Sequence, residues 1–232
     1  MDARPRAELR RIADRAAAEL RDATAEEILR WAGGTFGDRL AVASSMADTV
    51  LVDLAARHAP GVHVLFLDTG YHFPETIGTR DAVAATYPIT LVTVSPEQTV
   101  AEQDLWYGPG LYARDPDKCC ALRKIAPLDA ALEHYDAWLT GVRRDESPTR
   151  ADTPVIGWDD RRGKVKVSPL AGWTADDVAE YAVRQGVLLN PLLADGYLSV
   201  GCRPCTTRVD PGADPRSGRW TGRAKTECGL HL

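Results

Sequence analysis

Four of the five cysteines in this 232-residue chain form two close pairs. Cys119 and Cys120 are adjacent, and Cys202 and Cys205 enclose two residues. Four thiolates favour zinc or an iron–sulfur cluster, although structural zinc sites usually separate paired cysteines by two to four residues. The residues alone leave open an iron–sulfur cluster, a zinc site, a redox dithiol at Cys202 and Cys205, or buried cysteines, and the low hydrophobicity around both pairs argues against the last.

The fifth cysteine, Cys228, stands apart near the C-terminus. From residue 202 onward, six Lys or Arg face three acidic residues, a local charge of +3. A thiolate in electropositive surroundings is the form that acts as a nucleophile. Arg216 and Arg219 could clamp a phosphate or sulfate within reach of Cys228. A cysteine without a role is the alternative.

Lys124 follows Cys120 by four residues in a predicted helix, so both side chains share one helix face. An ammonium group there could lie beside an anionic thiolate cluster and link it to an anionic substrate. A solvated helix lysine is the alternative.

Two polar segments follow predicted strands. Segment 44–49, SSMADT, lies where a phosphate-binding turn would precede a helix, but it lacks the glycines of a Walker loop or a dinucleotide fingerprint. Segment 68–70, DTG, could contact a ribose or adenine, or be a plain turn. The candidate nucleotide-binding residues are Ser44, Ser45, Asp48, Asp68, Thr69 and Gly70.

The hydrophobic pattern predicts an α/β fold with a doubly wound, mainly parallel sheet behind a helical N-terminal segment. The expected strands are 39–43, 62–67, 89–94, 137–141 and 165–167. The expected helices are 7–23, a second one capped by Thr24 and Glu27 that ends at Gly33-Gly34, 47–58, 74–86, 118–134 with a kink or restart at Pro127, and one capped by Thr174 and Asp177 that runs to Gln185. Ligands of such sheets bind beyond the carboxyl ends of the strands.

Composition limits the partners. The net charge is −5, and 44% of the residues are hydrophobic against 26% charged. We expect a protein that binds neither nucleic acid nor membrane, without a leader sequence, in a reducing cytoplasm. We expect one domain over 1–205 and a flexible basic tail, not a packed element, over 206–232. The sequence leaves homo-oligomer formation open.

Over about residues 36–232, the chain resembles the assimilatory adenylylsulfate and phosphoadenylylsulfate reductases, specifically the iron–sulfur branch that prefers adenylylsulfate. The most specific matches are ECGLH at 227–231 and the two cysteine pairs. The resemblance implies the adenine-nucleotide α-hydrolase-like sheet of pyrophosphate-loop enzymes. Ser45 and Met46 replace the glycines of the usual pyrophosphate loop, so we expect its close backbone approach to a pyrophosphate to be lost.

The resemblance also implies residue roles. Cys228 would be the nucleophile that forms an S-sulfonate, and Lys124, Arg143, Arg216 and Arg219 would hold the phosphosulfate. The ligands of a [4Fe-4S] cluster would be Cys119, Cys120, Cys202 and Cys205. No thioredoxin-like segment precedes the end at Leu232, so we expect a separate thioredoxin as electron donor.

Three other functions compete. A phosphoadenylylsulfate reductase is the nearest, although its cluster-free members lack the cysteine pairs. An ATP-dependent sulfur-transfer enzyme is disfavoured by the missing glycines. A zinc-binding interaction module with four cysteine ligands would leave Cys228 unexplained.

Overall fold

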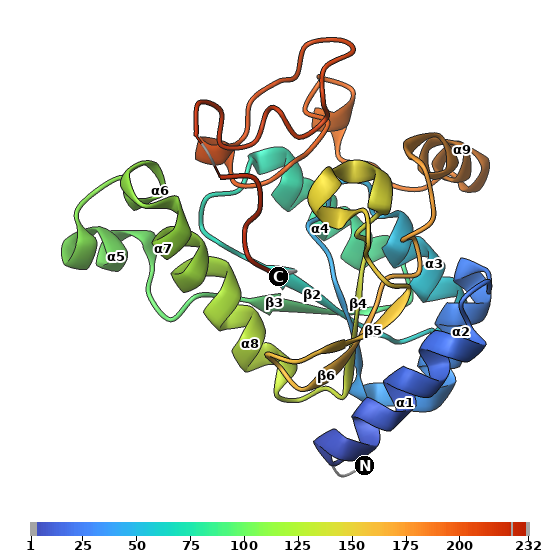
Figure 1. Ribbon diagram of the computed structural model, residues 1–232. Coiled ribbons are helices and arrows are strands. Elements are labelled where there is room, and N and C mark those ends of the chain that lie inside the picture. Colours follow the sequence, from blue (N-terminus) through green and yellow to red (C-terminus); the bar gives the residue numbers. More distant parts are fainter. Residues whose placement is uncertain (1–3, 224, 231–232) are drawn as a thin grey trace.

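The described residues, 4–223 and 225–230 of this computed structural model, form a six-stranded sheet in the order β3-β2-β1-β4-β6-β5 (Figure 1). All neighbouring strands pair in parallel except β5, which is antiparallel to β6. The strands are β1 (Leu40–Ala43), β2 (His63–Leu67), β3 (Thr90–Val94), β4 (Ala137–Thr140), β5 (Ile156–Asp159) and β6 (Lys164–Val167). The mainly parallel α/β sheet is confirmed.

Helices connect the strands and cover both faces of the sheet. The α-helices are α1 (Arg6–Glu19), α2 (Ala25–Phe36), α3 (Val50–His58), α4 (Pro74–Thr86), α5 (Val100–Tyr107), α6 (Leu111–Arg114), α7 (Pro116–Cys120), α8 (Ala126–Leu132) and α9 (Ala175–Gln185). In the described part of the chain, no helix is long and apolar enough to cross a membrane.

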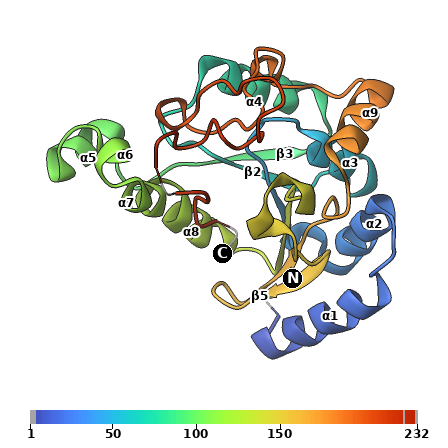
Figure 2. The ribbon, with the colours of Figure 1, turned by 45° about the horizontal axis from the view of Figure 1, so that its top comes forward.

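Alternation along the strands divides the core between the two faces. Val64 and Phe66 of β2 pack in the larger cluster, together with side chains of α1, α2, α3 and α9. Leu65 faces the other way, into a smaller cluster formed with Trp138 and with Leu128 of α8. Figure 2 shows α8 and the C-terminal segment on this second side of the sheet.

Several predicted boundaries are corrected. The helix expected to stop at Gly33-Gly34 continues to Phe36, whose buried ring contributes to the core, and Gly37 follows with a φ of 52°. The helix expected from residue 47 begins at Val50, because Thr49 takes a left-handed conformation that cannot continue a right-handed helix. The cap formed by Thr174 and Asp177 is confirmed.

The expected helix 118–134 is divided in three. Residues 121–125 form a π-helical turn between α7 and α8, and Pro127 follows in the first turn of α8. Proline lacks an N–H, so the first turn of a helix tolerates it. Cys120, Ala121, Ile125 and Ala126 all keep right-handed helical angles, so the helix continues past Pro127 and the irregularity is the π-helical turn before it.

Helix α5 and strand β5 were not predicted. The α5 helix begins with a capping box of Thr99 and Glu102, but its exposed Leu105 and Trp106 give no clear apolar face. The β5 strand lies at the sheet edge inside a stretch that reads as polar, and only alternate residues of it are apolar. Such short elements are set by tertiary context.

The described part of the tail forms neither an α-helix nor a multi-residue strand, but it does pack on the domain, unlike the unpacked tail expected. Trp220 is buried, Thr206 and Arg219 form an isolated bridge, and Leu230 packs against the smaller core cluster. The tail's flexibility and the division at residue 205 remain predictions. His231 of the ECGLH motif lies outside the described residues.

Candidate active site

A cavity of about 300 Å³ opens at the carboxyl ends of β1, β2 and β4. The wall of this cavity is formed by residues that follow these three strands and by the C-terminal tail. This is the position expected for a ligand site on such a sheet. The predicted site residues that line it are Ser44, Ser45, Asp48, Thr69, Lys124, Arg143, Cys202, Arg216, Arg219 and Cys228. Asp68 and Gly70 do not line this cavity.

Segment 44–49 forms a tight loop between β1 and α3. Met46 and Thr49 have φ values of 56° and 52°, a region that favours glycine. The Met46 N–H donates to Ser44 Oγ at 3.2 Å, and the Val50 N–H donates to Asp48 Oδ1 at 3.0 Å. The loop thus takes a glycine-like shape without glycine.

Buried contacts from another segment hold this loop. Asn190 donates through Nδ2 to the Met46 carbonyl and to Thr76 Oγ1, both at 3.0 Å. The Asn190 N–H donates to the Ala47 carbonyl at 3.0 Å, and the Thr49 hydroxyl donates to the Leu188 carbonyl. A side chain 99% shielded from solvent therefore stabilises the strained loop.

The acidic residues of the two strand-end segments differ in surroundings. Burial raises the pKa of Asp48, against the opposing effects of the Val50 N–H and the Arg143 charge. Asp68 Oδ1 accepts the Gly70 N–H at 3.0 Å, and Arg80 lies 3.8 Å from its other oxygen. Asp68 thus shapes its turn, whereas Asp48 faces the cavity.

The four predicted cluster ligands line a second, smaller cavity. Cys119 and Cys120 end α7, Cys202 precedes a short 3-10 turn (Arg203–Cys205), and Cys205 ends that turn. Thr69 Oγ1 lies 3.3 Å from Cys202 Sγ. Lys124, Cys202 and Trp220 line both cavities, so they form the wall between them.

The thiols fit a shared metal cofactor. Burial, reinforced by the neighbouring cysteine charges, raises the pKa of Cys119 to about 12, and burial raises that of Cys120 to about 11. Buried soft thiolates become stable when iron or zinc compensates their charge. Among the described residues, no three His, Cys, Asp or Glu side chains converge on a single-ion site. In a four-iron cluster each thiolate binds a different iron, so the four sulfur atoms surround the cluster at larger mutual distances than the ligands of one ion.

Arg123 is a residue that the sequence did not point to. Its buried guanidinium donates to the Thr69 and Gln98 carbonyls and to Gln103 Oε1. A Cβ at Gly70, whose φ is 71°, would lie 3.1 Å from Arg123 Nη2. Arg123 therefore fixes the end of β2 to the cysteine-bearing helix, and glycine permits this close approach.

Lys124 contributes a positive charge between the cysteines and Cys228. Burial acts to lower the pKa of Lys124, but the charges of Cys202 and Cys228 act to raise it, and the net shift is upward. The partly buried ammonium group is therefore held in its charged form beside both thiols.

The three predicted anion-binding arginines differ in their partners. Arg143 pairs with Asp145 at 3.0 Å. Arg216 donates to the Thr226 carbonyl at 2.6 Å. The Arg219 guanidinium lies 4.5 Å from the centre of the Trp220 ring.

Of these three arginines, Arg219 has spare hydrogen-bonding capacity. Its Nε is buried and has no hydrogen-bond partner among the described residues. By contrast, Arg216 Nη2 lies 3.2 Å from a Glu227 oxygen, and burial together with Arg150 lowers the Arg216 pKa. Arg219 and Lys124 are therefore the cations best placed to take a ligand anion.

A family model described as the phosphoadenosine phosphosulfate reductase domain matches residues 39–208. The chain belongs to this family. It is 65% identical to the adenosine 5'-phosphosulfate reductase of Streptomyces coelicolor, over 97% of this chain and 95% of that protein. It is 60% identical to the enzyme of the same name from Mycolicibacterium smegmatis, with the same coverage of both chains.

Solved structures give the same family and fold. The phosphoadenylyl-sulfate reductase of Candida auris, in a phosphate complex, has a TM-score of 0.74 and 31% identity, covering 84% of this chain and 96% of its own. An FMN adenylyltransferase from Candida glabrata, bound to ATP, has a TM-score of 0.57 at 12% identity, covering 93% and 74%. The latter similarity shows the fold alone.

Within this reductase family fold, the structure adds residues that the sequence reasoning missed. Asn190 holds the loop at 44–49, Arg123 joins β2 to the cysteine segment, and Arg150 binds Glu227. Arg123 precedes the predicted Lys124, and Glu227 precedes Cys228. Their positions next to predicted site residues were the available signal in the sequence for Arg123 and Glu227, because their contact partners lie far away in the sequence.

Proposed function

We propose that this protein reduces adenylylsulfate to sulfite and AMP through an S-sulfonate on Cys228. The observation that carries the proposal is the position of Cys228, which lines the same cavity as Lys124 and Arg219 although it belongs to a separate segment. A nucleophile thus shares a site with cations suited to a sulfated nucleotide. The nearly full-length relatives named adenosine 5'-phosphosulfate reductase support the same substrate.

The phosphosulfate and the nucleoside of the substrate need different parts of the cavity. Lys124 and Arg219 are assigned to the phosphosulfate, since charge-assisted hydrogen bonds to oxyanions are the strongest available there. The loop at 44–49 and Thr69 are assigned to the nucleotide. Arg143 and Arg216 are assigned to the edge of the anion site, where they also bind carboxylates.

In the first step, the Cys228 thiolate attacks the sulfate sulfur. A bond forms between the two sulfur atoms, and the bond from the sulfate sulfur to the bridging phosphate oxygen breaks. AMP leaves with that oxygen and its electron pair. A phosphate is a weakly basic leaving group, so no strong general acid is required.

In the second step, a dithiol supplies two electrons. One of its thiolates attacks Cys228 Sγ, sulfite leaves, and a mixed disulfide forms. The second thiol of the donor then resolves this disulfide and returns the Cys228 thiol. We assign the donor role to a thioredoxin in the cytoplasm, and the sulfite to assimilation toward cysteine.

A [4Fe-4S] cluster is assigned to Cys119, Cys120, Cys202 and Cys205. When bound, it would supply an anionic iron–sulfur centre to the wall behind the substrate cavity. Lys124 lies in that wall and balances negative charge there. The zinc alternative is tested by elemental analysis, since a cluster brings iron with acid-labile sulfide.

The function is tested by turnover on two substrates. Purified protein is mixed with thioredoxin and either adenylylsulfate or phosphoadenylylsulfate, and sulfite and nucleotide release are measured. We expect equal amounts of sulfite and AMP from adenylylsulfate, and none from the Cys228→Ser variant. No sulfite from the wild-type protein would contradict the proposal.

The second candidate is a phosphoadenylylsulfate reductase. The specific observation that favours it is the TM-score of 0.74 with the Candida auris enzyme of that name. Faster turnover of phosphoadenylylsulfate than of adenylylsulfate in the same experiment would select it. The higher identity to the adenosine 5'-phosphosulfate reductases favours the first candidate.

A further inference from the structure

Side-chain and carbonyl contacts alone anchor the tail segment 225–230, which carries Cys228. Among the described residues, no backbone-to-backbone hydrogen bond involves this segment. Its polar anchors join Glu227 to Arg150, Arg216 and Thr149, Lys225 to Asp117, the Thr226 carbonyl to Arg216, and the Leu230 carbonyl to Arg162. The placement of Cys228 therefore depends on a few individual contacts.

The anchor next to Cys228 is the strongest of these by geometry and burial. Arg150 binds Glu227 with two parallel hydrogen bonds, Nε to Oε1 at 2.8 Å and Nη2 to Oε2 at 2.9 Å. The two side chains are only 11% and 9% exposed, whereas Asp117, the partner of Lys225, is 80% exposed. Shielded, bidentate pairs hold far better than exposed ones.

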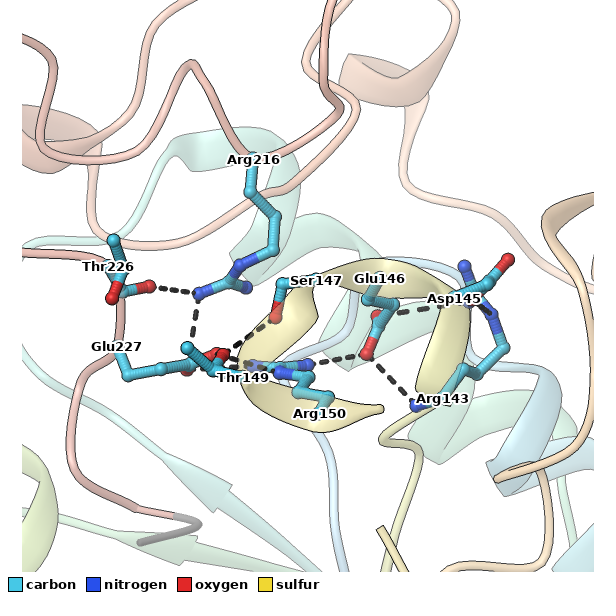
Figure 3. A network of polar contacts seen from close by, with 9 residues as sticks. All are labelled: Arg143, Asp145, Glu146, Ser147, Thr149, Arg150, Arg216, Thr226 and Glu227. Carbon is cyan, nitrogen blue, oxygen red and sulfur yellow. Dashed lines mark hydrogen bonds and ion pairs between the residues drawn. The ribbon is translucent and has the colours of Figure 1, made fainter. Parts of the chain in front are cut away.

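Figure 3 shows that the Glu227 contact is part of a chain of polar contacts that continues through Arg150 and Glu146 to Arg143. Arg150 Nη1 also binds Glu146 at 2.5 Å, and Glu146 accepts the Arg143 N–H at 3.0 Å. Arg150 is thereby held in place from its other side. A positioned guanidinium loses less entropy when it binds the tail.

The Glu227 carboxylate is kept charged at neutral pH. Burial acts to raise its pKa, but hydrogen bonding and charge from Arg150 outweigh this, and the net shift is downward. The pair therefore persists above the ordinary carboxyl pKa and is lost only as the pH falls below it.

We propose that Glu227 is the positioning residue for the nucleophile, holding Cys228 at the anion cavity by docking its carboxylate on Arg150 and Arg216. Consecutive Cα atoms are 3.8 Å apart, so fixing Glu227 leaves Cys228 little freedom. The glycine at 229 carries no side chain, and a Cβ there would lie 3.0 Å from Ile125 Cδ1, so the far side of Cys228 is also closely packed.

The first test measures the accessibility of Cys228 without any substrate. The metal-loaded protein is treated with iodoacetamide, and alkylation of Cys228 is followed by mass spectrometry in the wild type, in Glu227→Gln and in Asp210→Asn. Losing a charge-assisted pair shifts a docking equilibrium by about tenfold or more, so Glu227→Gln should alkylate about tenfold faster. Asp210 is an exposed tail carboxylate, so Asp210→Asn should match the wild type. Equal rates in the wild type and Glu227→Gln would overturn the proposal.

The second test concerns the reaction and rests on the proposed function. Glu227→Gln should lower the rate of Cys228 sulfonation by about tenfold with little change in the adenylylsulfate KM, because among the described residues Glu227 pairs with Arg150 and Arg216 and not with Lys124 or Arg219, the cations assigned to the phosphosulfate. Glu227→Asp, which keeps the charge, should recover part of the loss. A raised KM with an unchanged rate would contradict a positioning role. If the wild type forms no sulfonate, the proposed function fails while the alkylation test still decides the role of Glu227.

Discussion

The loop at 44–49 and the tail segment 225–230 meet at one cavity but are held in opposite ways. The loop lies between a central strand and a buried helix, and Asn190 binds its backbone from within the core. The tail segment rests on the domain through side-chain and carbonyl contacts, which include the ion pairs of Glu227 and Lys225. The loop is part of the folded core, whereas we expect the tail segment to detach without unfolding the rest of the domain.

This difference assigns separate tasks to the two regions. A fixed loop suits recognition of a nucleotide, because a preformed site does not spend binding energy on ordering. A detachable tail suits a cysteine that must first face the substrate inside the cavity and then meet an external dithiol. Changes in the fixed part should therefore affect stability, cofactor or binding, and changes in the tail segment 225–230 should affect the reaction of Cys228.

The largest expected effect is on the four cysteines that line the smaller cavity. Replacing Cys119, Cys120, Cys202 or Cys205 with Ser should abolish cluster incorporation, because each thiolate fills one iron site. Iron and acid-labile sulfide analysis measures this. The Cys228→Ser variant is the matched control and should keep its full iron content. If any one of these four Ser variants kept its full iron and sulfide, the four-ligand assignment would be disproved.

Arg219→Ala should weaken adenylylsulfate binding by about 10- to 150-fold, because a charge-assisted hydrogen bond contributes about 1.5–3 kcal/mol. Arg216→Ala should cost less, since Arg216 already binds Thr226 and Glu227. Equilibrium binding of adenylylsulfate in the absence of reductant compares the two. If Arg216→Ala lost more adenylylsulfate affinity than Arg219→Ala, Arg216 and not Arg219 would be the main anion-binding arginine.

Asn190→Ala should destabilise the whole protein by about 1–3 kcal/mol, because it leaves the Met46 carbonyl buried without its donor. Thermal unfolding measures the shift in Tm. Glu227→Gln, a change in the tail, should leave Tm nearly unchanged. The contrast between loop and tail would be wrong if the tail variant lowered Tm as much as the loop variant.

The smallest effect is expected for Lys225→Ala. Its partner Asp117 is 80% exposed, and exposed ion pairs contribute about 0–1 kcal/mol. Alkylation of Cys228 should rise no more than about fivefold. A rise larger than that of Glu227→Gln would move the main anchor of the tail from Glu227 to Lys225.

Patterns among neighbouring residues predicted much of the fold. Hydrophobic runs located the central strands, and capping residues located the start of α9, because these signals depend on neighbours in sequence. The elements they missed, α5, α6 and β5, are short and lie at the edge of the fold. Short elements have weak local signals and form through tertiary contacts.

The same distinction between local sequence signals and tertiary contacts holds for the candidate site. The cysteine pairs, Lys124 and Cys228 could be selected by residue type and spacing. Their partners could not, because Arg150 lies 77 residues from Glu227 and Asn190 lies 144 residues from Met46. Charge counting predicted a basic tail, but it could not show that Arg216 pairs with Glu227 while Arg219 Nε has no hydrogen-bond partner among the described residues.

The most direct measurement of the central claim is mass spectrometry of the protein mixed with adenylylsulfate and no reductant. Cys228 alone should gain one sulfonate, with one AMP released per adduct. The Cys228→Ser variant should gain none while keeping its iron. A sulfonate on Cys202 or Cys205, or AMP release without an adduct on Cys228, would contradict the account.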